Sequence, residues 1–133
     1  MERGARMAYL IVAWLFVVCV VVQFFLAGLG VFENGARFAT HRDFGYLFGW
    51  LAFFLPILAL LARLPRRQFV GGSLLVLVLF FMQSVFVALR ASVPIVAALH
   101  PLNGALILIL GVVLAMRARR YVPAPLGIAP RGL

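Results

Sequence analysis

Two histidines, His41 and His100, are the residues of this sequence best suited to chemistry, and they stand in matching surroundings. Each is followed four positions later by a glycine, Gly45 or Gly104, which places the glycine one helical turn along on the same face. Two imidazoles at one depth on opposite sides of a helix bundle can ligate one haem iron from both faces. The pattern therefore predicts a bis-histidine haem site, with a glycine-lined strip beside each ligand.

Glutamines repeat with the histidines. Gln23 precedes His41 by 18 positions, and Gln83 precedes His100 by 17. A polar side chain inside a membrane span is costly unless it faces other helices. The repeat therefore predicts that both halves of the chain contribute equivalent residues to one central volume.

The other residues of the predicted site are assigned by role. The glycine-lined strips continue through Gly49 and Gly111, and three phenylalanines could form walls, namely Phe44, Phe48 and Phe81. Thr40 or the Ala97 carbonyl is expected to hold the second ring nitrogen of an imidazole. Guanidinium groups bind carboxylates bidentately, so Arg37, Arg42 and Arg90 are candidate partners of the haem propionates. The alternative is that they are ordinary loop charges.

These residues must be positioned by helices that lie in lipid. Of the 133 residues, 66% are hydrophobic and 11% are charged, whereas soluble domains contain roughly 25% charged residues. A soluble domain of about 150 residues buries only about 70% of its unfolded surface, which leaves too small a core for so many apolar side chains. The composition predicts an all-α integral membrane protein.

Four apolar segments are long enough to cross a bilayer, which takes about 20 residues. We expect spans at about 7–32, 38–62, 68–90 and 94–117, forming one transmembrane domain over residues 1–121, and a flexible cytoplasmic tail over 122–133. The first and third spans run in the same direction. The fold class is therefore a four-helix bundle of two hairpins related by a parallel pseudo-two-fold axis.

Prolines and small residues add local expectations. Pro56 and Pro101 should lie inside the second and fourth spans and bend them. Gly45 and Gly104 should face inward and reject a leucine, whereas Ala59 and Ala115 should accept one if they face lipid.

Arginines predict the orientation. The net charge of +9 comes from 12 arginines, no lysines and three acids. The termini and the 63–67 loop carry nine of these arginines, against three on the opposite side. Positive residues accumulate in the cytoplasm, so both termini are expected there, and the lysine-free composition favours a bacterial inner membrane. The arginines stand at the ends of apolar runs and not on one basic face, which argues against a nucleic-acid partner.

The sequence resembles one four-helix half of the haem A synthase family. The likeness is carried by His41-Arg42 with Gly45, and by Gln83 leading through a short outer loop to His100. Small, uncharacterised four-span bacterial membrane proteins with the same two-histidine pattern are also similar. The resemblance implies histidines at the start of the second and fourth helices.

Departures from the family limit what the resemblance implies. This chain has one four-helix unit and lacks the cysteine pair of the outer loop, and Ala39 and Thr40 stand where the family has an acid before the histidine. What the likeness implies is a simpler b-type haem bundle and not haem A synthesis by this chain alone.

Two classes of function remain open. The first is a small membrane protein that binds haem b through His41 and His100 for electron transfer or haem handling. The second is a cofactor-free subunit or small-molecule binding bundle that assembles with other membrane proteins or as a homodimer. In the second class the histidines are interfacial residues and the glycines are helix-packing positions. No nucleophile arrangement, paired carboxylates or phosphate loop is present, so no autonomous enzymatic activity is predicted.

Overall fold

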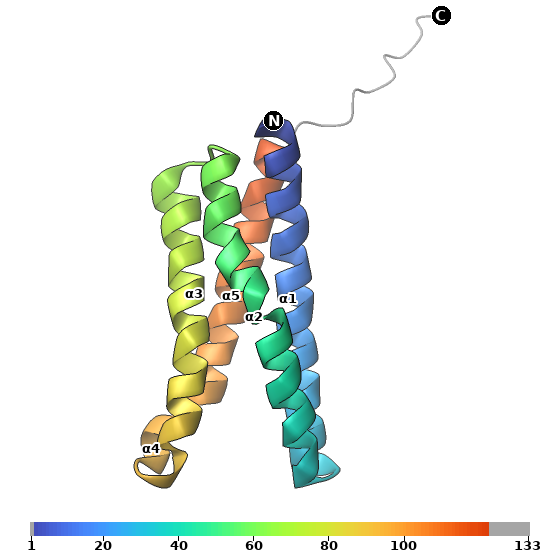
Figure 1. The fold of residues 1–133 in the computed structure, drawn as a ribbon, viewed down its shortest axis with the longest axis vertical. Coiled ribbons are helices and arrows are strands. Elements are labelled where there is room, and N and C mark those ends of the chain that lie inside the picture. Colours follow the sequence, from blue (N-terminus) through green and yellow to red (C-terminus); the bar gives the residue numbers. More distant parts are fainter. Residues whose placement is uncertain (1, 123–133) are drawn as a thin grey trace, which may run out of the picture.

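In the computed structural model, which describes residues 2–122, the chain folds into membrane-length helices (Figure 1). The helices are α1 (Glu2–Phe32), α2 (Phe38–Leu61), α3 (Arg66–Ala88), α4 (Pro94–Ala97) and α5 (Leu99–Ala118), with 3-10 turns at Gly35–Arg37, Leu89–Ala91 and Arg119–Tyr121. The segments long and apolar enough to cross a membrane are Glu2–Phe32, Gly35–Leu61, Arg66–Ala91 and Pro94–Tyr121. The predicted all-α four-span architecture is confirmed, and the chain is a multi-pass membrane protein.

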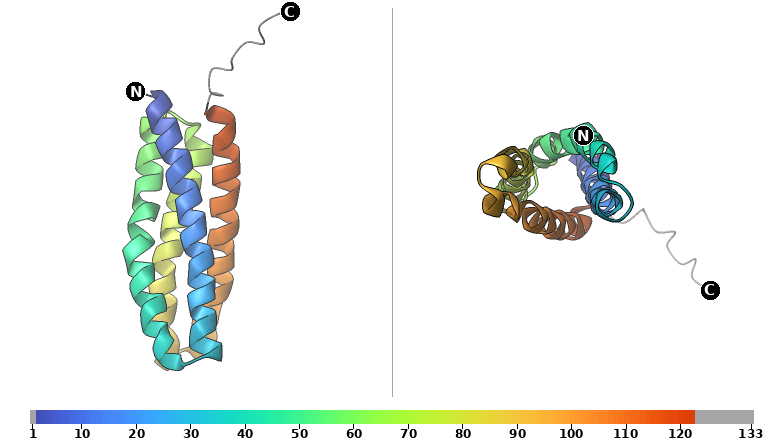
Figure 2. Two further views of the ribbon diagram at one scale, coloured as in Figure 1. Left: turned by 90° about the vertical axis from the view of Figure 1, so that its right-hand side faces the viewer. Right: turned by 90° about the horizontal axis from the view of Figure 1, so that it is seen from below.

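The spans stand around the bundle axis in the order α1, α2, α3 and α5 (Figure 2). α1 and α3 therefore occupy one diagonal of the bundle, and α2 and α5 occupy the other. Residues 2–6, 62–67 and 117–121 gather at one end, here called the arginine-rich end, and residues 33–41 and 89–100 form the opposite, histidine end (Figure 1). Beyond Val122, the predicted tail lies outside the described residues.

Apolar side chains cover the outside of the bundle as well as its centre. Trp50, Phe81 and Ile95 are 66%, 69% and 80% exposed, which suits helices whose outer faces contact lipid. Tyr9 and Ser73 are fully buried, and their hydroxyl oxygens lie 3.0 Å apart in a hydrogen bond between α1 and α3. A hydrogen bond inside the bundle satisfies polar groups that lipid cannot.

Alanines allow the helices to approach one another closely. Ala52 and Ala59 of α2 and Ala115 of α5 are each 0% exposed. Ala59 and Ala115 were expected to accept a leucine only if they face lipid, and this condition is not met, because both lie in the core. Their periodic apolar surroundings could not reveal this, since the lipid-facing side of these helices is equally apolar.

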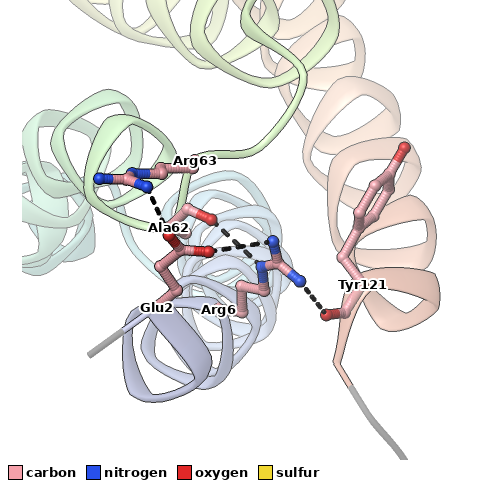
Figure 3. Close-up of polar contacts among 5 residues, drawn as sticks. All are labelled: Glu2, Arg6, Ala62, Arg63 and Tyr121. Carbon is pink, nitrogen blue, oxygen red and sulfur yellow. Dashed lines mark hydrogen bonds and ion pairs between the residues drawn. The ribbon is translucent and has the colours of Figure 1, made fainter.

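The arginine-rich end is held together by the first two turns of α1 (Figure 3). Arg6 donates from Nε to the Ala62 carbonyl at 3.2 Å and from Nη1 to the Tyr121 carbonyl at 3.5 Å. Glu2 pairs with Arg6 at 3.6 Å and with Arg63 at 2.8 Å. The Ala62–Pro65 loop turns sharply through Arg63, whose φ of 50° lies in the left-handed region. Contacts from α1 thus fix both the α2–α3 loop and the end of α5.

Prolines shape the fourth span differently from the expectation. Pro94 opens α4, and the helix is interrupted at Ala98, so that Pro101 lies in the first turn of α5. A proline there removes an N–H that would have no partner within the helix in any case. Pro56 lies inside α2, which continues past it to Leu61. The break at Ala98 starts a new helix, α5, at Leu99, so that His100 lies in its first turn.

Candidate functional site

Each histidine is held by a main-chain oxygen of the preceding span. His41, in the first turns of α2, places Nδ1 3.1 Å from the Gln23 carbonyl, and His100, in the first turn of α5, places Nδ1 3.2 Å from the Gln83 carbonyl. The expected partners, Thr40 and the Ala97 carbonyl, are therefore wrong. The antiparallel neighbour brings its carbonyl to the level of the ring, and a carbonyl oxygen has a second lone pair beyond its helical bond.

The two imidazoles meet across the bundle. The ring centroids of His41 and His100 are 6.1 Å apart, with an interplanar angle of 64°, although the helices that carry them stand on one diagonal. Both side chains are partly buried. With each Nδ1 engaged by a carbonyl, Nε2 is the nitrogen left on each ring for a further ligand.

Glutamine amides lie over the first glycine of each strip. A Cβ built on Gly45 would lie 2.7 Å from Gln23 Nε2, and one built on Gly104 would lie 3.1 Å from Gln83 Nε2. Both glycines therefore face into the bundle. The two hairpins share the histidine, glycine and glutamine pattern in sequence, and they also share the contact between the glutamine and the glycine. These contacts support the pseudo-two-fold relation between the hairpins.

The lower parts of the strips are closed by apolar side chains. A Cβ on Gly49 would lie 2.8 Å from Phe80, and one on Gly111 would lie 3.2 Å from Val17. A cluster of Phe16, Phe48 and Phe80 occupies this level, with ring centroids 5.3 to 6.1 Å apart.

Two of the three phenylalanines proposed as walls lie near the site. Phe44 and Phe48 are one turn apart on α2, and their rings are tilted by 39° with centroids 5.4 Å apart. Phe81 is 69% exposed and points away from the bundle, so its assignment as a wall is wrong.

Asn103 breaks the symmetry and was missed by the sequence reasoning. Its side chain is 6% exposed and donates to the Leu79 carbonyl at 2.8 Å and to Gln83 Oε1 at 3.0 Å. The corresponding position after His41 is Phe44, which offers no such donor. Gln23 Oε1 is buried without a hydrogen-bond partner among the described residues. An asparagine inside an apolar span is a signal that could have identified this network.

The outer arginines differ in their partners. Arg37 pairs with Glu33 at 2.7 Å, and Arg42 pairs with Asp43 at 2.8 Å. Arg90 lies at the opposite corner of the histidine end and donates to the Val87 carbonyl at 3.5 Å. Within residues 2–122, Arg90 is thus the outer arginine that has no ion pair.

Metal-binding capacity at this site rests on the two imidazoles. Over the described part of the chain, no three side chains of histidine, cysteine, aspartate or glutamate gather into a group able to hold a metal ion. A structural site built from protein ligands alone takes about four donors. Two imidazoles suit a metal whose other ligands come from a bound group.

Comparison with known families places residues 23–92, more than half of the chain, in a family of unknown function, DUF6220. The matched region contains Gln23, His41, Gly45 and Gln83, whereas His100 lies beyond it. Neither the curated proteins nor the solved structures give a match. The resemblance to one half of the haem A synthase family is not tested by these findings and stays a prediction. By the extent of the family match, the chain belongs to the DUF6220 family.

Proposed function

We propose that this protein binds haem b between His41 and His100 and serves electron transfer or haem handling in a bacterial inner membrane. The observation that carries the proposal is the 6.1 Å separation of the two ring centroids. A metal–imidazole bond is about 2 Å long, and a ring nitrogen lies about 1 Å from its centroid, so two axial imidazoles on one ion have centroids about 6 Å apart.

The tautomer of each ring supports the same assignment. A neutral imidazole that donates from Nδ1 to a carbonyl presents the lone pair of Nε2 to a metal. Carbonyls that hold the second nitrogen are the usual means by which a protein orients a histidine ligand. Both histidines have this arrangement, through Gln23 and Gln83.

Space for haem beside Gly45 and Gly104 can be opened by movement of neighbouring side chains. The atoms nearest Gly45 and Gly104 include the ends of flexible glutamine side chains, which can rotate away at little cost. Gln23 Oε1 is buried and unpaired among the described residues, and such an atom costs about 1–3 kcal/mol. A rearrangement of Gln23 on binding would remove that cost. The Phe16, Phe48 and Phe80 cluster would bound the site below.

The outer residues would hold the propionates. Arg90 is the first candidate because it has no ion pair within residues 2–122, whereas Arg37 and Arg42 would exchange their acids for propionates. A bound haem would supply one-electron redox chemistry, and ligation by both His41 and His100 would favour electron transfer over oxygen binding. The chain's own part is to hold both imidazoles in place and to exclude water with its apolar core.

The absorption spectrum of protein expressed with ample haem tests the proposal. We expect a strong Soret band and a sharp alpha band on reduction, and we expect His41→Ala or His100→Ala to abolish the low-spin spectrum. Thr40→Ala and Leu99→Ala, each one position before a histidine, are the matched controls and should keep it.

A second substitution separates ligand loss from misfolding. His100→Met retains an axial ligand and should keep haem with a raised reduction potential, since methionine ligation raises it. A colourless wild-type protein, or a low-spin spectrum that survives loss of either histidine in a helical, monodisperse sample, would contradict haem binding. The cofactor-free membrane subunit would then be the better assignment.

A further inference from the structure

An open groove lies at the arginine-rich end, at the opposite end of the bundle from the histidines. Its volume is about 850 Å³, and it runs between the start of α3 and the end of α5. Three arginines stand among its lining residues: Arg67, Arg117 and Arg120. Nothing in the proposed haem site uses this groove.

Among the described residues, 2–122, the three arginines have no acidic partner. The chain has three acids, and each is already in an ion pair, Glu2 with Arg6 and Arg63, Glu33 with Arg37, and Asp43 with Arg42. Gln68 can accept from Arg117 through its amide oxygen at 3.1 Å, which orients that guanidinium without neutralising it. Within residues 2–122, the groove therefore carries uncompensated positive charge.

The floor and walls of the groove are apolar. Leu75, Leu110 and Val113 line it below the arginines, and the distance from Arg67 to Leu75 along α3 is about 12 Å at 1.5 Å per residue. Gly72 packs against α5, where a Cβ would lie 2.9 Å from Leu114, but a Cβ on Gly71 would meet nothing closer than 3.9 Å. Gly71 therefore leaves the groove open beside the close contact that Gly72 makes.

We infer that this groove binds an anionic phospholipid, with the headgroup phosphate among Arg67, Arg117 and Arg120 and part of one acyl chain along Leu75, Leu110 and Val113. Arginine binds phosphate bidentately, and basic pockets between transmembrane helices recognise anionic headgroups. The apolar extension toward the membrane interior favours a lipid over a free phosphate ion, which would leave those walls without a ligand. The inference is independent of which leaflet the arginine-rich end faces.

Lipid titration of the purified chain in neutral detergent tests the inference. A fluorescent phosphatidylglycerol should bind more tightly than phosphatidylcholine of the same chain length. The double variant Arg117→Gln/Arg120→Gln should weaken phosphatidylglycerol binding more than tenfold, because each arginine near the surface contributes on the order of fivefold. Its matched control, Arg3→Gln/Arg119→Gln, removes equal charge from the same end outside the groove, where Arg119 lies over the Trp14 ring at 5.6 Å.

A steric variant tests the apolar part. Gly71→Leu should block the groove and weaken lipid binding without loss of helicity, whereas Gly4→Leu, which also projects into open space on α1, should leave binding unchanged. Equal losses in the two double arginine variants would show unspecific attraction and overturn the inference. Full competition by inorganic phosphate, or equal affinity for phosphatidylcholine, would overturn it as well.

Discussion

At the residue scale, main-chain oxygens set the orientation of the two imidazoles. The partner of His41 is the Gln23 carbonyl, and that of His100 is the Gln83 carbonyl. Since both are main-chain groups, neither contact requires a particular side chain at position 23 or 83. The orientation depends on how each hairpin packs. The glutamine side chains are free for a second task, which in one half is the hydrogen bond with Asn103.

Residue spacing revealed part of this site before the structure. The paired histidines, glycines and glutamines could be recognised because a repeat in sequence becomes a repeat in space when two hairpins are related by symmetry. The carbonyl partners could not be recognised, since they depend on the relative depth and rotation of neighbouring helices. Phe81 was misassigned for the same reason. Its span is apolar, so the sequence does not show which of its phenylalanines face the bundle.

Gly104 tests the close approach beside the histidine pair. A leucine at this buried glycine would meet Gln83 at 3.1 Å and Phe24 at 3.4 Å from its Cβ alone, so Gly104→Leu should destabilise the bundle by about 1–3 kcal/mol through overpacking. Unfolding in mixed detergent micelles measures the change. Gly28→Leu is the control because a Cβ there has no neighbour within 4 Å. Equal unfolding midpoints for the two variants would show that Gly104 does not face inward.

At the element scale, small residues determine how closely α2 and α5 pack against their neighbours. Without a hydrophobic driving force in lipid, helices associate through van der Waals contact, and alanine allows that contact. Ala59 and Ala115 are completely buried, although sequence alone left them open to a lipid-facing assignment. The existence of each helix could be predicted from the length of its apolar segment. Which side of the helix faces the core could be seen only in the structure.

Ala59→Leu should therefore be costly. The substitution inserts three carbons into a contact that has no exposed surface, and overpacking of this kind costs about 1–3 kcal/mol. Thermal unfolding in detergent, followed by circular dichroism, provides the measurement. Ala88→Leu, at an exposed alanine of α3, is the matched control. A melting temperature of Ala59→Leu equal to that of Ala88→Leu would contradict the burial of Ala59.

The boundaries of the second and third spans were predictable to within a turn, whereas α1 begins at Glu2, earlier than the predicted start at residue 7. The fourth span shows a further limit. A proline inside an apolar run could bend a helix or begin one, and length favoured a single bent helix from Pro94. The structure instead begins α5 at Leu99, after an interruption at Ala98. Composition could not decide between the two because both leave the same residues in the membrane.

At the scale of the whole molecule, the arginine bias predicts which side each end faces. The orientation predicted from the sequence places the arginine-rich end in the cytoplasm. In a variant with Cys19 replaced by serine, cysteine at position 66 should react with a membrane-impermeant maleimide only when the cytoplasmic side is open, and cysteine at position 34 should react from outside. Position 66 starts α3 and Asn34 lies in the α1–α2 turn, both exposed. The opposite labelling pattern would reverse the orientation.

The number of spans followed from the lengths of the apolar segments, and the predicted pseudo-two-fold axis placed the two histidine-bearing spans on one diagonal. Short loops require α1 to neighbour α2 and α3 to neighbour α5. They do not by themselves decide whether α1 or α2 stands beside α5. The structure places α1 beside α5 and leaves the two histidine-bearing spans on a diagonal. That placement is what allows two residues from separate hairpins to approach at the centre.

Arg6 makes its two contacts with parts of the chain that are synthesised at very different times. The Ala62 carbonyl is 56 residues away and the Tyr121 carbonyl is 115 residues away. At about 5–20 residues per second, the first partner leaves the ribosome roughly 3–11 s after Arg6, and the second needs about twice as long. The hydrogen bond from Arg6 to the Ala62 carbonyl can therefore form and stabilise the first hairpin while the second is still being translated. Arg6 completes its bonding only when the last helix has been delivered to the membrane.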